Sequence, residues 1–273
     1  MRAYVDAGVD AIGIWEIKLP ERGGDAAALE LLDASGLGSA AAVPAIPSIL
    51  PLPLMEGPDD PAARIDAICA SLHRLAPFQP TNIVCLTGPG DARDTVVDGL
   101  RTIAEEADRV GVRVGVEPIN RIGGENWTMI SSLPEAVELV DAADRPALGI
   151  QFDTWHLWNT PALLADVERY ADRFVGVHVA DWREPTRSWA DRVLPGDGVG
   201  DIPAILGALD RAGWDGYYDV EIFSDNGAFG NAWADSLWDV PPAELARRAR
   251  DAFDRVWAAR NQIPVDRVTP GAL

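Results

Sequence analysis

The sequence predicts one (β/α)8 barrel, a TIM barrel, that spans residues 1–273 and lacks its first strand or has it truncated. The chain has 273 residues, close to the roughly 250 of one such barrel. Seven short apolar runs alternate with longer amphipathic segments, which is typical of a parallel sheet with crossover helices. Several runs are hydrophobic almost throughout, as strands covered on both faces are. The expected strands are residues 10–16, 40–48, 81–88, 113–119, 148–155, 174–181 and 216–224.

The chain begins with what we expect to be the end of a helix. Residues 2–7 are followed by Gly8, and glycine readily adopts the left-handed conformation that ends helices. A helix in this place implies a strand before it, and seven expected strands are one fewer than a barrel of this kind contains. Either the first strand is missing at the N-terminus or the barrel closes differently, and we favour the missing strand.

The segments between the strands fit connecting loops and helices. The proline-rich stretch 44–61 is expected to form one long loop after the second strand. Residues 91–110 carry apolar side chains at helical spacing, which predicts a helix with one buried face. Another helix is expected after Ser132, which would serve as its N-cap, with Pro134 at an early helical position and Glu135 at N3.

Composition and charge exclude several classes of protein. No run of about 18 apolar residues is present, so no membrane span is expected. The first residues lack the features of a secretory signal, and we expect a cytoplasmic protein. A net charge of −20 argues against nucleic-acid binding, which needs a basic surface. Two cysteines are too few for a disulfide framework.

Four expected strands end with side chains that suit a metal ion. Glu117, Asp153 and Glu221 each end an apolar run, and His178 lies in the run Val-Gly-Val-His-Val. In a parallel barrel such ends converge at one face, where charged groups are costly unless they are paired or coordinated. The alternative is that the four residues form separate ion pairs at the barrel rim. Three carboxylates and one imidazole would suit one Mn²⁺ best, or Mg²⁺ or Co²⁺, rather than a structural zinc.

The order of motifs resembles that of the xylose-isomerase-like TIM-barrel superfamily. The motifs are Val-Glu-Pro, Phe-Asp-x-x-His, Val-His-Val-x-Asp, Pro-Gly-x-Gly-x-Gly-Asp-Ile-Pro and Val-Glu-Ile, and the similarity covers residues 8–257. The superfamily includes sugar phosphate isomerases and epimerases, ketose 3-epimerases, inosose dehydratase and C-glycoside deglycosidase catalytic subunits. The resemblance implies a catalytic metal held by Glu117, Asp153, His178 and Glu221. It also implies that His156 and Arg192 bind substrate.

Two departures from the pattern leave the exact substrate open. Epimerases of the superfamily often carry a further glutamate six residues after the first metal ligand, where this chain has Gly123, with Glu125 nearby. Many relatives have Lys-Asp after the histidine, where this chain has Ala180-Asp181. Nor does a glycine loop with basic residues mark a phosphate site near the later strands, so neutral substrates are favoured over phosphorylated ones.

Ten tryptophans are present, and most fall at strand ends or in the loop after the last strand. Their flat faces suit stacking against a sugar or an aromatic aglycone, although for most of them packing of loops onto the barrel is the favoured explanation. Trp15 is the one that we expect to form a wall of the substrate pocket. The residues concerned are Trp15, Trp127, Trp155, Trp158, Trp182, Trp189, Trp233 and Trp238.

The predicted reaction is proton transfer next to the carbonyl of a sugar. The metal would stabilise an enediolate, Glu117 and Glu221 would act as base and acid, and His156 and Arg192 would orient the substrate oxygens. Return of the proton to the other face gives epimerisation, and return to the neighbouring carbon gives isomerisation. Expulsion of a leaving group would instead make the enzyme a lyase, either a dehydratase or the catalytic subunit of a C-glycoside deglycosidase.

The expected partner is a small-molecule sugar or glycoside, with a homo-oligomer or a second subunit as further possibilities. A non-catalytic sugar-binding barrel is the alternative from another class, although such barrels typically lose their metal ligands. DNA-repair endonucleases of related fold need a histidine cluster for three zinc ions, and three histidines with a net charge of −20 argue against that class.

Overall fold

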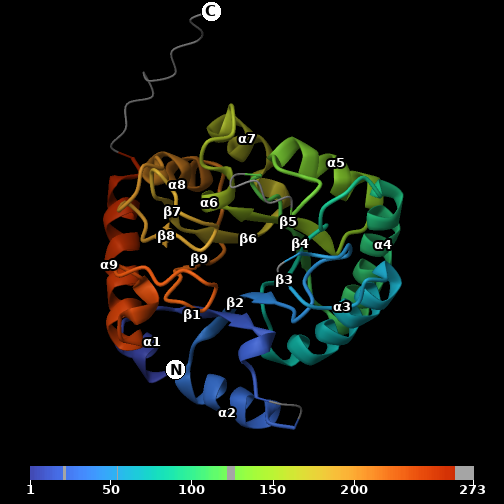
Figure 1. Ribbon diagram of the computed structural model, residues 1–273, viewed down its shortest axis with the longest axis horizontal. Coiled ribbons are helices and arrows are strands. Elements are labelled where there is room, and N and C mark those ends of the chain that lie inside the picture. Colours follow the sequence, from blue (N-terminus) through green and yellow to red (C-terminus); the bar gives the residue numbers. More distant parts are fainter. Residues whose placement is uncertain (21–22, 54, 122–126, 262–273) are drawn as a thin grey trace, which may run out of the picture.

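Seven parallel strands form one curved sheet that nearly closes into a barrel in the computed structural model (Figure 1). The structure describes residues 1–20, 23–53, 55–121 and 127–261. Each strand pairs in parallel with the next in the order β1-β2-β3-β4-β5-β6-β9. The strands are β1 (Ala11–Trp15), β2 (Gly38–Val43), β3 (Asn82–Cys85), β4 (Val114–Val116), β5 (Leu148–Asp153), β6 (Phe174–Val179) and β9 (Tyr218–Val220).

The expected fold class is confirmed as a nearly closed barrel of seven parallel strands, consistent with a TIM barrel that lacks one strand. All seven expected runs overlap a strand, but the strands are shorter because flanking residues enter loops, and β2 begins two residues before its expected run. The two edge strands, β1 and β9, approach each other: a Cβ atom added to Gly13 of β1 would lie 2.4 Å from Oδ2 of Asp219 in β9.

Helices cover the outside of the sheet (Figure 1). The longest are α4 (Arg93–Val110) and α9 (Pro242–Ala259). The remaining helices of the outer layer are α1 (Arg2–Asp6), α2 (Asp25–Ser35), α3 (Pro61–Leu75), α5 (Leu133–Ala143), α7 (Leu163–Tyr170) and α8 (Ile202–Arg211). None of the described helices is long and apolar enough to cross a membrane. The short elements are α6 (Thr154–Leu157), η1 (Glu16–Lys18), η2 (Ala76–Phe78), η3 (Ala171–Arg173) and η4 (Leu237–Asp239).

The N-cap expected at Ser132 and the turn expected at Gly8 are both present, whereas the capping box is incomplete. The Ser132 hydroxyl accepts a hydrogen bond from the Glu135 backbone N–H at 3.4 Å and so caps α5. The Glu135 carboxylate does not complete the reciprocal bond of a capping box, since it accepts from the Ser131 N–H instead. The segment after α1 turns at Gly8, whose φ of 71° is left-handed.

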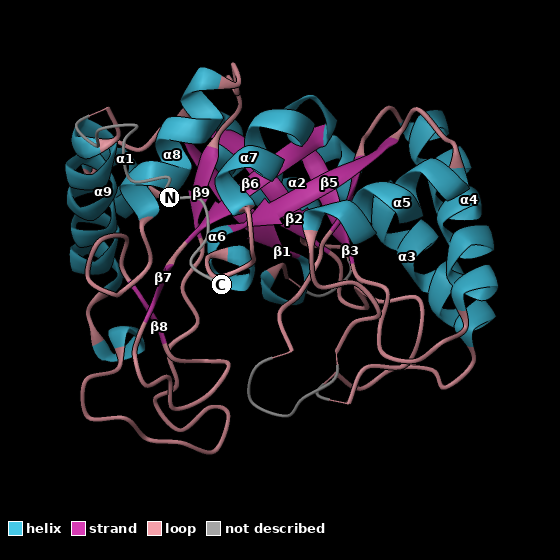
Figure 2. Cartoon of the chain, turned by 90° about the horizontal axis from the view of Figure 1, so that it is seen from above, coloured by secondary structure: helices cyan, strands magenta, loops and turns pink. Residues whose placement is uncertain are grey.

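The core lies between the sheet and the helices. The expected apolar face of α4 packs inward, with Val96, Leu100 and Ile103 fully buried. Phe152 of β5 stacks on Phe174 of β6, with ring centroids 5.2 Å apart. Figure 2 shows that the long loops gather at one end of the strands.

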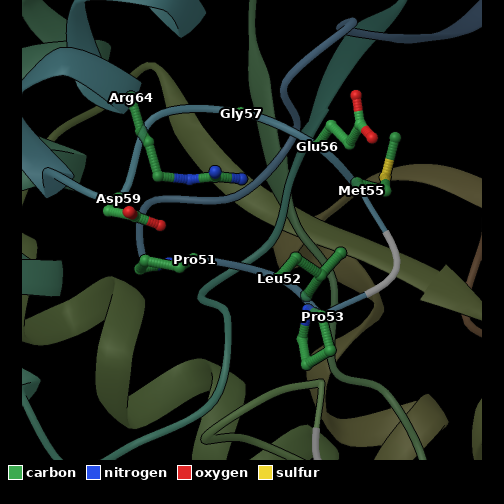
Figure 3. A pocket seen from close by; sticks show the side chains of 8 residues that line it. All are labelled: Pro51, Leu52, Pro53, Met55, Glu56, Gly57, Asp59 and Arg64. Carbon is green, nitrogen blue, oxygen red and sulfur yellow. The ribbon is translucent and has the colours of Figure 1, made fainter.

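The proline-rich loop after β2 is also confirmed, because the described residues of this stretch, 44–53 and 55–60, contain no helix and no named strand, and α3 begins at Pro61. A hollow of about 440 Å³ lies between this loop and the start of α3. Its lining includes Leu52, Met55 and Arg64, which Figure 3 labels. Arg64 stabilises the loop, because its guanidinium donates hydrogen bonds to the Ser48 carbonyl and hydroxyl and to the Pro58 carbonyl. None of the lining residues is among the predicted site residues.

Candidate metal centre

The four predicted ligands lie at the carboxyl ends of four neighbouring strands. Glu117 directly follows β4, Asp153 ends β5, His178 lies near the end of β6, and Glu221 directly follows β9. Asp153 and His178 are register partners on adjacent strands. The parallel sheet therefore brings together residues that are up to about a hundred positions apart in the chain.

Glu117, Asp153 and His178 each offer one ligand atom within 4.8 Å of the others, and all three residues are buried. The Nδ1 atom of His178 lies 3.5 Å from Oε1 of Glu117 and 3.4 Å from Oε2 of Glu221. Glu221 lies next to the His178 ring, whereas the compact group of ligand atoms contains only Glu117, Asp153 and His178 among the described residues.

Two buried atoms in this cluster have no hydrogen-bond partner among the described residues, Oε1 of Glu117 and Nδ1 of His178. An unsatisfied buried polar atom costs about 1–3 kcal/mol, and more when the group is charged. A divalent cation between these atoms would satisfy both. Oxygen donors with one imidazole suit hard or borderline divalent ions, so the residues fit the expected metal.

Burial and mutual repulsion shift the ionisation of the cluster. Burial raises the pKa of Glu117 to about 7 against the opposing effect of His178. Burial alone would lower the pKa of His178, but Glu221 and Glu117 together raise it to about 10. For Asp153 the effect of burial is outweighed by Arg192 and the two histidines, and its pKa is lowered. Without a cation the cluster therefore holds protons at neutral pH.

Arg192 lies directly against the cluster. It belongs to β8 (Arg192–Val193), which pairs with β7 (Asp181–Trp182) in a small antiparallel sheet. Its NH1 group donates to Oδ2 of Asp153 at 2.8 Å and to Oε2 of Glu221 at 2.9 Å. The guanidinium lies 4.8 Å from the Trp155 ring and 5.0 Å from the Phe223 ring. Two carboxylates and two rings thus fix its position.

His156 lies beside Arg192, with Nε2 3.4 Å from its NH2 group and 3.7 Å from Oδ2 of Asp153. Burial lowers the pKa of His156 to about 3, so its ring is neutral at physiological pH. Nδ1 of His156 and Nε of Arg192 are buried without a hydrogen-bond partner among the described residues. Each side chain therefore has a buried polar atom that a bound molecule could satisfy.

The glycine-rich loop, residues 195–200, follows β8 and is held by Asp181. The Asp181 carboxylate accepts hydrogen bonds from the backbone N–H groups of Trp182, Gly196, Gly198 and Gly200. A Cβ atom on Gly198 would lie 2.3 Å from the Trp182 carbonyl oxygen, so only glycine fits there. The aspartate of Ala180-Asp181 is thus an anchor for this loop.

Six aromatic rings, which we call the rim cluster, form a connected group that reaches Arg192. Phe223 contacts Trp15 and Trp189, each at a centroid distance of 5.4 Å. Trp15 therefore lies one ring away from the guanidinium, and its expected place in the substrate pocket stays a prediction. The rim cluster consists of Trp15, Trp127, Trp189, Phe223, Phe229 and Trp238.

The other tryptophans pack against the protein itself. Trp155 and Trp182 are buried side by side, with centroids 4.7 Å apart, and Trp158 packs on Trp182. Trp233 lies under the guanidinium of Arg187. For these residues the structure favours loop packing over contact with a ligand.

Two residues near the cluster were not singled out from the sequence. Asp219 Oδ2 lies 4.0 Å from Nε2 of His178, and Phe223 covers Arg192. Both lie two residues from Glu221, so the two-residue period of a strand was the signal that could have indicated them. Gly123 and Glu125, which mark a departure from the epimerase pattern, fall outside the described residues.

Comparison with known proteins decides the family. The family profile described as xylose isomerase-like TIM barrel matches residues 1–256. The chain belongs to this family. The resemblance seen in the motifs is thereby confirmed.

Curated relatives of this xylose isomerase-like chain are isomerases, epimerases and dehydratases. A 3-dehydroshikimate dehydratase of Pseudomonas putida is 29% identical over 155 residues, covering 52% of this chain and 23% of the relative. An inosose isomerase of Bacillus licheniformis is 25% identical, covering 49% and 48%. A ketose 3-epimerase of Arthrobacter globiformis is 26% identical, covering 49% and 46%. The matches thus span half or less of these relatives.

Solved structures share the fold over nearly the whole chain. A protein of Sinorhizobium meliloti 1021 superposes with a TM-score of 0.79 at 24% identity, covering 93% of this chain and 91% of that one. The IolI protein with a bound zinc atom gives a TM-score of 0.75 at 16% identity, covering 96% and 95%. At these identities the likeness establishes the fold.

Proposed function

We propose that this protein is a divalent-metal-dependent isomerase or epimerase that moves a proton next to the carbonyl of a sugar. The observation that carries the proposal is the buried group of Glu117, Asp153 and His178, with ligand atoms within 4.8 Å of one another. Relatives named inosose isomerase and ketose 3-epimerase support the reaction class. We propose Mn²⁺ as the ion, with Mg²⁺ and Co²⁺ as alternatives.

The proposed ligands are Glu117, Asp153, His178 and Glu221. A cation held there would supply stabilisation of the negative charge that develops on the substrate oxygens when a C–H proton leaves. Glu117 and Glu221 come from β4 and β9, with β5 and β6 between them in the sheet. Their origin on separate strands supports the proposal that one acts as base and the other as acid on a bound sugar.

His156 and Arg192 are proposed to hold the substrate oxygens. Each keeps a buried polar atom without a hydrogen-bond partner among the described residues, Nδ1 and Nε respectively. The neutral imidazole can donate to a hydroxyl or accept from it, while the guanidinium only donates. Trp15, which contacts Phe223 at the edge of the site, would shield one side from water.

The proposal is tested by metal analysis and by deuterium incorporation. Purified protein is incubated in D₂O with keto sugars, with and without Mn²⁺, and the C–H positions next to the carbonyl are followed by NMR. We expect metal-dependent incorporation that is lost in Glu117→Gln and Glu221→Gln. Glu138→Gln, at an exposed position of α5, serves as a matched control and should keep full activity. A protein that binds no divalent ion and labels no sugar would instead support the non-catalytic sugar-binding barrel.

A lyase that acts on a keto-glycoside is the second candidate, and the rim cluster favours it. Phe229, with 43% of its surface exposed, continues the aromatic surface from Phe223 outward, where an aromatic aglycone could stack. The relative named 3-dehydroshikimate dehydratase also supports an elimination. Incubation with a 3-keto C-glucoside and Mn²⁺ should then release free aglycone, with a second subunit added if none appears. Absence of aglycone together with labelling of simple ketoses rejects this candidate.

A further inference from the structure

The imidazole of His178 has carboxylates on both of its edges. Nδ1 faces Glu117 and Glu221 at 3.5 and 3.4 Å, and Nε2 faces Oδ2 of Asp219 at 4.0 Å. Nδ1 has no hydrogen-bond partner among the described residues and faces the centre of the cluster, so it is the atom placed to bind a metal. A histidine that binds a metal is neutral and carries its remaining proton on the other nitrogen. The N–H of His178 would then point toward Asp219.

We propose that Asp219 is a positioning residue of the metal centre, which holds His178 in the tautomer whose Nδ1 is free to bind the ion. This inference rests on the proposed function, because it requires that a metal binds. Carboxylates that accept the second N–H of a metal-binding histidine fix the orientation of the ring and make the other nitrogen a better donor. Asp219 lies on the correct side of the ring to act in this way.

The local structure explains how Asp219 reaches this position. Asp219 and His178 are register partners on the adjacent strands β9 and β6, so their side chains share one face of the sheet. The space for the carboxylate exists because the facing residue on β1 is Gly13, where an added Cβ atom would lie 2.4 Å from Oδ2. Gly13→Ala should therefore displace the carboxylate without changing its chemistry.

Mn²⁺ affinity, measured by calorimetry, tests the proposal. Asp219→Ala removes the acceptor and should weaken binding about 10- to 100-fold. Asp219→Asn keeps an oxygen that accepts the N–H, so its affinity should stay within about threefold of the wild type. Asp215→Asn, which removes one charge at an exposed position of the same segment, should bind like the wild type.

The tautomer itself is observed by ¹⁵N NMR of histidine-labelled, Zn²⁺-loaded protein, a readout that a purely structural role would not change. The chain contains three histidines, so the His178 resonances are assigned by mutation. We expect a protonated Nε2 and a metal-bound Nδ1 in the wild type and in Asp219→Asn. In Asp219→Ala and Gly13→Ala the Nε2 proton should lose protection from exchange with water, and metal affinity should fall.

The outcomes separate this inference from the proposed function. A wild type that binds neither Mn²⁺ nor Zn²⁺ overturns the metal centre and this inference with it. A wild type that binds metal, with unchanged affinity and ¹⁵N shifts in Asp219→Ala and Gly13→Ala, overturns only the role of Asp219. If Asp219→Ala fails to fold, as judged by circular dichroism, unchanged affinity in Gly13→Ala overturns it equally.

Discussion

Metal binding at this centre should release protons, and the number released should depend on pH. In the metal-free protein the pKa of Glu117 is about 7 and that of His178 is about 10. Both groups must be deprotonated before they bind a cation. Binding of Mn²⁺ therefore competes with protons, and its affinity should rise with pH.

The two pKa values give the size of the effect. At pH 8 His178 is almost fully protonated and Glu117 mostly ionised, so about 1.1 protons should leave per ion bound, and at pH 6 about 1.9. Between pH 8 and pH 6 the affinity should therefore fall about 1000-fold, or about 4 kcal/mol at 1.36 kcal/mol per pH unit and proton.

Titration calorimetry in buffers of different ionisation enthalpy counts the released protons directly. Glu117→Gln is the matched variant, because it removes one of the two titrating groups and should release about one proton at both pH values. Release of less than half a proton at pH 6, or an affinity that is equal at pH 6 and pH 8, would refute this account of the centre.

Three further predictions concern binding and stability. Arg192→Gln removes a cation that lies on two proposed ligands, so Mn²⁺ should bind about tenfold more tightly by calorimetry while turnover falls. Ser132→Ala removes the N-cap of α5 and should lower the free energy of unfolding by about 1 kcal/mol in urea; an unchanged midpoint would contradict the capping role. The raised pKa of His178 stabilises the metal-free fold below pH 6.5, so that stability should be lost as pH rises toward about 10. A urea midpoint that rises over this range in EDTA would show the opposite sign.

The sequence was sufficient for the barrel and for the grouping of the proposed ligands. Apolar runs placed seven strands, and the parallel arrangement of a barrel then places Glu117, Asp153 and His178 at a common end, as the structure has them. Strand limits were less well predicted, because residues such as Ser48 and Gly88 continue the apolar runs but lie in loops that form only isolated bridges.

The surroundings of the cluster depend on contacts that no local pattern reveals. Arg192 donates to Asp153 from a segment whose following loop is held by Asp181, through N–H groups 15 to 19 residues away in the chain. Trp15 and Trp155 both follow apolar runs, yet Trp155 is buried at the start of α6 and Trp15 joins the rim cluster. Whether each ring is buried or lies at the rim depends on how loops from separate strands pack together.

The position of β9 at the edge of the sheet would give a bound ion a mechanical role. Among the described strands β9 pairs with β6 alone, and it leads directly into Glu221. An edge strand held by one neighbour frays more easily than a central one. A bound cation would tie β9 to β4, β5 and β6. Hydrogen exchange of the β9 amides should therefore slow more on metal binding than that of other strands, whereas exchange of the β3 amides should change little. Metal binding would then stabilise the open edge of the barrel against local unfolding.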